Sequence, residues 1–253
     1  MVRGQYIAGT GMMLQRRLME NITNNISNAD TTGYKKEHIV SHSFDEVMVE
    51  RINDPNVLSQ TRKVGPLNMG TQIDQLYVDF TEGSLEGTDR NTDLAIVGDA
   101  FFVVGTTASE RYTRSGAFYI DEAGYLVDGE GNYLLGENGN IYVGSMNFSV
   151  DALGGVRVGG ADEYADRIRV VSFEDNDTLR KQGSNLYFSL QAPQATPNQY
   201  RIAQRFLEGS NVDIGREMVD MLTVYRTYET NQRMLTMIDE TVGKAVNEIG
   251  RLR

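Results

Sequence analysis

The last forty residues carry a helical stripe that is too long to be buried inside a globule of 253 residues. Large side chains recur there at alternating spacings of three and four, the heptad pattern of a helix that packs along its length. The heptad positions are Met218, Met221, Tyr225, Tyr228, Gln232, Leu235, Asp239, Val242, Val246 and Ile249. Asp213 precedes the series at a position suited to a helix N-cap. At 1.5 Å per residue the helix is roughly 50 Å long, so we expect its stripe to lie outside any globular core.

A second helical pattern runs from Ile7 to about Asn28. Its apolar side chains lie mostly at spacings of four and seven, on one face of a helix. They are Ile7, Leu14, Leu18, Ile22 and Ile26. Three glycines among the first eleven residues each disfavour the helix by about 1 kcal/mol relative to alanine. We therefore expect this helix to need a partner.

A run of turn-forming residues follows, from Asn28 to Tyr34. A left-handed conformation at Gly33 would end the helix at low cost, although an ordinary flexible turn explains this glycine equally well. Asn21, Asn25 and Asn28 recur at heptad-like spacing, and buried asparagines can fix the register of paired helices. The alternative is that this polar end of the helix simply faces water.

Between the two helical patterns the composition becomes that of antiparallel sheet. Fifteen of the 26 glycines lie between Gly83 and Gly160, where short runs of β-forming residues alternate with turn formers. The predicted strands are Leu94–Val97, Phe101–Val104, Ala117–Ile120, Tyr125–Val127, Tyr133–Leu135, Ile141–Val143, Ile168–Phe173 and Leu186–Leu190. We expect Phe101, Phe102 and Phe118 to lie in the core of this sheet.

The sequence therefore predicts an α+β fold in three parts. Residues 1–33 and 210–253 form N- and C-terminal helices of a coiled-coil domain, and residues 81–209 form a central antiparallel β-rich domain. Residues 34–80 form an extended connector with hairpin character, with one predicted strand at Ile73–Phe80. Because neither helical stripe can be buried by a β-domain that lies between them, the pattern suggests a subunit whose ends pack in a polymer.

Charge and residue types exclude several classes of function. A net charge of −11 argues against nucleic acid or an anionic membrane as the partner. The absence of cysteine excludes thiolate catalysis, a cysteine zinc site and disulfides. His38 and His42 are four residues apart, as metal ligands on one helix face can be, but no third ligand has a matching spacing. We therefore expect no metal there.

Catalytic patterns are missing as well. Asp121, Asp128 and Glu130 lack the twelve-residue ligand pattern of a calcium loop, so we expect them to stabilise hairpin turns. The sequence contains no G-x-S-x-G, Walker or dinucleotide glycine pattern. Acidic pairs suited to glycoside hydrolysis arise by chance among 35 acidic residues. We expect no catalytic residue, no cofactor and no enzyme activity.

The N-terminal segment holds no uninterrupted apolar run, because Arg16 and Arg17 interrupt it. Signal peptides and membrane spans both require such a run. We expect the protein not to be inserted in a membrane, and any export to use a route other than a cleaved hydrophobic signal.

Three stretches resemble the family of bacterial flagellar rod and hook proteins. The first is NNISNADTTGYK at residues 24–35, at the end of the first helix. The second is DLAIVGDAFFVV at residues 93–104, followed by YTRSGAF at residues 112–118. The third is LEGSNVD at residues 207–213, with EMV at 217–219 and YETN at 228–231. They occur in the family's order and together span nearly the whole chain. Ala100 and Gly209 depart from the usual residues without affecting the resemblance.

This resemblance implies a structural subunit of the flagellar basal-body rod. Such subunits leave the cell through the flagellar type III export apparatus without signal cleavage, and assemble helically with copies of themselves and with other rod and hook proteins. The resulting hollow shaft crosses the periplasm, transmits torque to the hook and lets exported subunits pass. The terminal helices of such subunits form an inner coiled-coil tube.

The assembly interface then lies on both terminal helices. Its residues are Leu14, Leu18, Ile22, Asn25, Met218, Met221, Tyr225, Tyr228, Leu235, Val242 and Val246. The position of the subunit in the proximal or distal rod stays open.

Two alternatives remain at this point. A hook or hook-junction subunit of the same family would fit the three stretches, although hook subunits usually carry a large extra outer domain. A periplasmic enzyme or glycan-binding module acting on peptidoglycan would need a concave site with convergent carboxylates or aromatic side chains. The chain has no tryptophan for stacking on a sugar.

Overall fold

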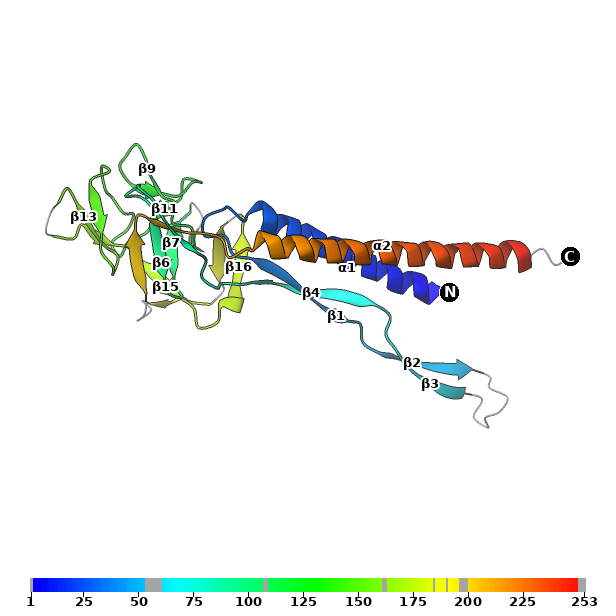
Figure 1. The fold of residues 1–253 in the computed structure, drawn as a ribbon. Coiled ribbons are helices and arrows are strands. Elements are labelled where there is room, and N and C mark those ends of the chain that lie inside the picture. Colours follow the sequence, from blue (N-terminus) through cyan, green and yellow to red (C-terminus); the bar gives the residue numbers. More distant parts are fainter. Residues whose placement is uncertain are drawn as a thin grey trace. The chain divides into compact units, whose positions relative to one another are not determined.

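The computed structural model describes residues 2–52, 61–106, 109–160, 163–183, 185–189, 191–195 and 200–249. Its fold is α+β, as the sequence predicts, with a long C-terminal helix and many antiparallel strands (Figure 1). Contacts divide the chain into two compact units. Unit 1 comprises Met1–Ile26, Glu37–Tyr77 and Ile214–Arg253, and unit 2 comprises Ser27–Lys36 and Val78–Asp213.

Unit 1 contains the two long helices. Helix α1 spans Val2–Ser27 and helix α2 spans Ile214–Lys244, followed by a π-helical turn at Ala245–Ile249. Both predicted helices are confirmed, and Asp213 directly precedes α2. Helix α1 ends at Ser27, next to the predicted end at about Asn28, so of the two readings of Gly33 a turn beyond the helix is the one that fits. Gly33 does adopt the left-handed conformation, with φ of 66°, in the turn that follows.

Unit 1 also contains a two-stranded ribbon. Strands β1 (Glu37–Ser43) and β4 (Thr71–Val78) pair at its base, and β2 (Val47–Ile52) pairs with β3 (Thr61–Leu67) beyond them. Residues 53–60 of the predicted connector lie outside the described residues. The two histidines lie on β1 rather than on a helix. The predicted strand Ile73–Phe80 corresponds to β4.

Unit 2 is built from short antiparallel strands. They are β5 (Leu85–Gly87), β6 (Leu94–Val97), β7 (Phe101–Gly105), β8 (Glu110–Thr113), β9 (Tyr119–Ile120), β10 (Leu126–Val127), β11 (Tyr133–Leu134), β12 (Phe148–Val150), β13 (Gly155–Val158), β14 (Asp166–Arg167), β15 (Val170–Ser172), β16 (Leu179–Gln182), β17 (Leu186–Ser189), β18 (Gln194–Ala195), β19 (Arg201–Gln204) and β20 (Phe206–Glu208), with a 3-10 turn at Asn176–Thr178. Within the described residues, the largest sheet follows the order β16-β17-β8-β7-β11-β10-β9, and β15 joins it through β7 and β18. Separate ladders join β6 to β19, β5 to β20, and β12 to β13 and β14.

Most of the predicted strands are confirmed to within three residues at either end, but Ile141–Val143 is not a strand. Its backbone instead makes single bonds to neighbouring strands, such as that from Leu126 N to Ile141 O (3.0 Å). The sequence did not predict short polar strands such as β8 and β14, because their residues lack the apolar alternation that indicates a strand.

Strand β7 forms the centre of unit 2 because both of its faces are buried. Phe102 and Val104 point into one apolar cluster with Phe118, whereas Phe101 and Val103 point into a second cluster. All three predicted core phenylalanines have no solvent exposure. A strand buried on both faces reads as a continuous apolar run, which explains the FFVV sequence.

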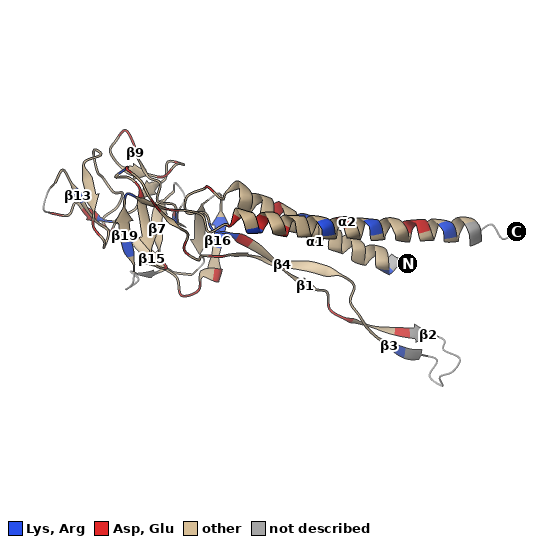
Figure 2. Ribbon diagram, in the orientation of Figure 1, with Lys and Arg blue, Asp and Glu red and all other residues tan. Residues whose placement is uncertain are grey.

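The two units differ in charge. Unit 2 contains 22 acidic and 12 basic residues, a net charge of −10, whereas unit 1 contains 13 acidic and 12 basic residues, a net charge of −1. Figure 2 shows charges of both signs along α2 and acidic positions spread over the loops of unit 2. The net negative charge of the chain therefore lies almost entirely in unit 2.

Candidate assembly site

Two segments far apart in sequence lie side by side in unit 2. Gly33 N donates to Glu208 O (2.7 Å), and Lys36 N donates to Asn211 Oδ1 (2.7 Å). The first segment continues from the end of α1, and the second leads to the start of α2. These two contacts therefore hold together, within unit 2, the segment that follows α1 and the segment that precedes α2.

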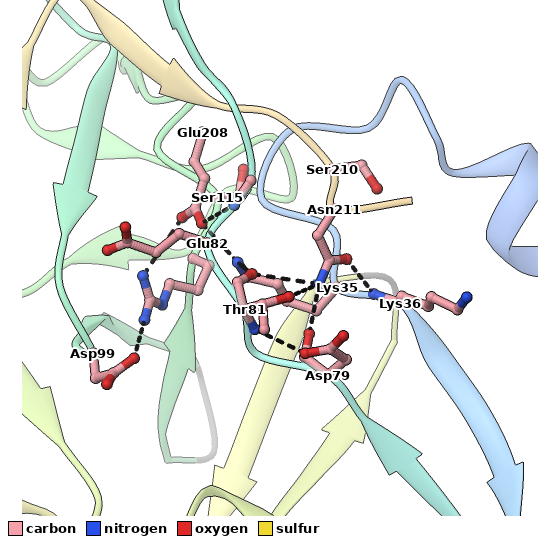
Figure 3. A network of polar contacts seen from close by, with 12 residues as sticks. Lys35, Lys36, Asp79, Thr81, Glu82, Asp99, Ser115, Glu208, Ser210 and Asn211 are labelled. Carbon is pink, nitrogen blue, oxygen red and sulfur yellow. Dashed lines mark hydrogen bonds and ion pairs between the residues drawn. The ribbon is translucent and has the colours of Figure 1, made fainter. Parts of the chain in front are cut away.

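Charged side chains fill the space around this contact (Figure 3). Lys35 Nζ donates to Glu208 Oε1 (2.6 Å) and to Thr81 O (2.6 Å), and Gly83 N donates to the same carboxylate oxygen (3.2 Å). Arg114 Nη1 lies 3.6 Å from Glu208 Oε2. We call Lys35, Arg114 and Glu208 the Glu208 cluster; all three side chains are at most 1% exposed.

Arg114 is held mainly by its charge and its flat face. Its guanidinium carbon lies 4.9 Å from the centre of the Phe101 ring, a cation–π geometry. Its second ion pair, to Asp99, spans 3.9 Å, and the Asp99 side chain is 85% exposed. None of its three guanidinium nitrogens makes a hydrogen bond within the described part of the chain. A buried guanidinium with unused donors is costly.

The electrostatics of Lys35 show the same cost. Burial lowers the pKa of the Lys35 ammonium below its usual value of 10.5, and the nearby positive charge of Arg114 lowers it further. Glu208 raises the pKa in the opposite direction, but not enough to offset burial and Arg114 together. The charged form of the ammonium is therefore less favourable at this place than in water.

Asn211 and Gly33 complete the contact with uncharged groups. Asn211 Nδ2 donates to Asp79 O (2.8 Å) and to Thr81 Oγ1 (3.0 Å), so one amide joins residues 36, 79 and 81. A Cβ at Gly33 would overlap the backbone of Arg114 and Ser115. Glycine is therefore required there for close packing as well as for its positive φ.

A second buried polar cluster lies in unit 1. Asn25 exchanges two hydrogen bonds with the backbone of Glu37, donating through Nδ2 to O (2.8 Å) and accepting at Oδ1 from N (3.1 Å). Asn25 Nδ2 also donates to Glu217 Oε2 (3.3 Å) in the first turn of α2. All three residues are at most 5% exposed. Of the two readings of Asn25, the buried one is confirmed.

The predicted interface residues separate into covered and exposed groups. On α1, Leu14, Ile22 and Asn25 are buried and Leu18 is half-buried. On α2, the half-buried residues are Met221, Tyr228, Leu235 and Val242. The exposed residues are Met218 (53%), Tyr225 (50%) and Val246 (66%).

The covered stripe of α2 is displaced from the heptad series read from the sequence. Its least exposed positions are Glu217, Met221, Val224, Tyr228, Asn231, Leu235, Ile238, Val242 and Ala245, at spacings of four and three. On α1 a series of partly or fully covered residues at the same spacings is Gly4, Ala8, Gly11, Gln15, Leu18, Ile22 and Asn25, and Leu14 beside Gln15 is also buried. The heptad series read from the sequence shares every second position with this covered stripe. At the other positions it names the next residue along the chain, which is exposed.

The two helices also line an open apolar groove of about 660 Å³ within unit 1. Its lining residues are Gln5, Tyr6, Gly9, Thr10, Met12, Met13, Arg16, Tyr228 and Leu235. Beside the covered stripe, α2 presents a ridge that we define as Met218, Leu222 and Tyr225, all at least 50% exposed. A groove and a ridge of apolar character are thus present on the same unit.

The residues weighed for metal binding make other contacts. The His38 ring stacks on Tyr77 at 5.8 Å, and His42 Nε2 lies 2.6 Å from Gln72 Nε2. Asp128 Oδ1 accepts from the backbone N of Glu130 and Asn132 (both 2.9 Å), as expected for a hairpin turn. Among the described residues, no group of three acidic or histidine side chains could hold a metal ion.

The sequence analysis gave no role to Lys35, Arg114, Glu208, Asn211 or Glu217. Each of them lies within one of the three stretches that carry the family resemblance. A charged residue inside an otherwise apolar or turn-forming stretch was the available signal.

No helix among the described residues is both long enough and apolar enough to cross a membrane.

Comparison with known proteins gives three matching family models. The "Flagella basal body rod protein" model matches residues 6–35, the "Flagellar hook protein FlgE/F/G D1 domain" model matches residues 95–158, and the "Flagellar basal body rod FlgEFG protein C-terminal" model matches residues 203–248.

Similar curated proteins match along almost their whole length. The chain is 32% identical to the flagellar hook-basal body complex protein FlhO of Bacillus subtilis, over 100% of both chains. It is 31% identical to the flagellar basal-body rod protein FlgG of the same organism, over 98% of this chain and 99% of the relative. The FlgG of Agrobacterium fabrum is 31% identical, over 94% of this chain and 96% of the relative.

Proposed function

The chain belongs to the flagellar basal-body rod and hook protein family as a structural subunit of the rod, and from this premise we propose how its helices build the polymer. The family is structural rather than enzymatic and implies assembly with other rod and hook proteins. We propose that copies of this chain assemble helically into a hollow shaft that transmits torque and lets exported subunits pass. Export through the flagellar type III apparatus without signal cleavage, and the absence of enzyme activity, are parts of the same proposal.

The first element of the proposal is an antiparallel coiled-coil pairing of α1 with α2. Three contacts support it: a Cβ at Gly4 would lie 3.0 Å from Ile238 Cδ1, a Cβ at Gly11 would lie 3.0 Å from Asn231 Nδ2, and Asn25 bonds to Glu217. The partner number on α2 falls as the number on α1 rises, and covered positions recur on both helices at alternating spacings of four and three. This is the spacing of a coiled-coil seam.

The glycines of α1 fit such a seam. They disfavour the isolated helix, but Gly4 and Gly11 let α2 approach where a larger side chain would collide. In this pairing Leu18, Ile22, Met221, Tyr228, Leu235 and Val242 contact the partner helix within one subunit.

The second element is the contact between subunits. We assign it to the ridge Met218, Leu222 and Tyr225, together with Val246, because these apolar side chains remain at least half exposed in the isolated chain. The groove lined by Tyr6, Met13 and Leu235 receives the ridge of a neighbouring copy. A ridge and a groove at different places on one subunit make a heterologous contact, which generates an open helix rather than a closed dimer. The exposed ridge is the observation that carries this proposal.

A charge placed in the ridge tests it. Leu222→Asp should leave the melting temperature of the free subunit unchanged, because Leu222 is 58% exposed, but should abolish polymers in negative-stain images. Thr223→Asp is the matched control, since Thr223 is exposed on another side of the same turn. Polymers of normal appearance from Leu222→Asp would show that the ridge is not the contact.

A further inference from the structure

The ladder that leads into α2 is poorly specified by apolar burial. Strands β20 and β5 pair over only three residues, with Glu208 opposite Leu85. All three residues of β5 are exposed, and Phe206 on β20 is 41% exposed. Register is weakly specified in short strands without a buried apolar face. Something other than hydrophobic patterning must select this register.

We propose that the Glu208 cluster sets the register of the two segments that lead to the terminal helices, and that it does so at a cost in stability. The buried ammonium of Lys35 and the buried guanidinium of Arg114 both need a carboxylate at one place. A slip of β20 by one residue would bring Leu207 or Gly209 to that place, and a slip by two would bring Phe206 or Ser210. None of these four residues is acidic, so each of these slipped registers leaves Lys35 and Arg114 without their buried carboxylate, with Arg114 keeping only its long ion pair to exposed Asp99.

The consequence for α2 follows from helix geometry, and its relevance to assembly rests on the proposed function. Only five residues separate Glu208 from Ile214, the first residue of α2. Each residue of a helix turns by about 100°, so a one-residue slip taken up at the start of α2 would turn the ridge away from its position. A polymer requires every copy to present the ridge in the same way.

The cost in stability is visible in two groups of the cluster. The guanidinium nitrogens of Arg114 make no hydrogen bond within the described residues, and burial together with Arg114 lowers the pKa of Lys35 despite the ion pair with Glu208. Buried ion pairs are often no more stabilising than apolar side chains of the same volume, and in some proteins they specify one arrangement instead. The Glu208 cluster has the features of that second role.

An apolar replacement of the cluster separates register from stability. The variant Lys35→Met, Arg114→Met, Glu208→Leu should melt at the same temperature as the wild type or higher. NMR of the monomer should then show more than one amide signal for residues 206–213, and polymerisation should need at least a tenfold higher protein concentration. The control is Glu110→Leu, Arg169→Met, which replaces an exposed ion pair of 2.6 Å and should change neither readout.

Two results would overturn the proposal. A single set of amide signals with unchanged polymerisation would show that the cluster does not select the register. A melting temperature well below that of the control would show that the cluster stabilises the fold instead. Because the NMR readout uses the monomer, it tests the register even if the wild-type protein does not polymerise, which would contradict the proposed function alone.

Discussion

Strand β7 and helix α2 both carry large apolar side chains that are stabilised by burial, but these side chains are buried to different extents. Phe101 and Phe102 on β7 have no solvent exposure, because unit 2 supplies a cluster for each face of the strand. On helix α2, one row of side chains is only partly covered, and Leu222 beside it is 58% exposed. Unit 2 thus completes its core within one chain, whereas unit 1 presents apolar surface that one chain does not cover. This difference is the reason for proposing that the subunit contacts lie on the helices.

The largest effect should come from truncating the core of unit 2. Phe102→Ala should lower the free energy of unfolding by about 3–5 kcal/mol, because it removes a fully buried ring and leaves a cavity. Tyr225→Ala, on the exposed ridge, should change it by less than about 0.5 kcal/mol. Urea denaturation of the monomer measures both. Similar losses from the two substitutions would remove the distinction between the regions.

Glu208→Gln should have an effect of nearly the same size. It removes the buried carboxylate that Lys35 and Arg114 share and leaves Arg114 only its long ion pair to exposed Asp99, which costs about 3 kcal/mol or more. Glu110→Gln is the matched control, because its partner Arg169 is partly exposed and such pairs contribute about 0–1 kcal/mol. Equal unfolding curves for the two variants would show that the buried cluster carries no more coupling than a surface pair.

Leu235→Asp should act more on assembly than on the monomer. Leu235 is half-buried and lines the groove, so the change removes at most about 2 kcal/mol of apolar burial in the free subunit. In a polymer the carboxylate would be desolvated in every copy, which should prevent assembly. Arg233→Ala, two residues away and exposed, should assemble normally in electron micrographs. Loss of unit 2 folding in Leu235→Asp would place α2 in the monomer's own core.

Salt should have the smallest effect, and it should favour assembly. In the proposed polymer, neighbouring copies would bring together units 2 that each carry a net charge of −10. Raising the ionic strength shortens the screening length from about 10 Å at 0.1 M to about 3 Å at 1 M. The concentration needed for polymerisation, measured by sedimentation, should therefore fall modestly as salt increases. A rise would indicate that ion pairs rather than apolar contacts hold the subunits together.

Much of the fold could be predicted from the sequence because its signals are local. Heptad spacing predicted α2, and the FFVV run predicted the buried strand β7. The covered stripe of α2 was misplaced by one position at alternate turns, since exposed Met218 and Tyr225 are as apolar as half-buried Met221 and Tyr228. The type of a side chain indicates that its burial is favourable, but it does not indicate which neighbouring element or subunit buries it.

The Glu208 cluster could not be predicted, for a different reason. Lys35, Arg114 and Glu208 are separated by 79 and 94 residues along the chain and meet only after unit 2 has folded. A single sequence offers no local pattern for such a contact. The family resemblance marked all three stretches but gave their charged residues no role.

Hydrogen exchange of the subunit before and after polymerisation tests the central claim most directly. In a subunit shown by sedimentation to be a monomer, amides of α1 and α2 should exchange faster than amides of β6 and β7, with boundaries near Ser27 and Ile214, because the pairing of the two helices covers them only partly. Polymerisation should slow exchange in both helices and leave β6 and β7 unchanged. Helices that in the monomer are already as protected as β7, with no further protection on polymerisation, would contradict the account, because unit 1 would then need no neighbouring copy.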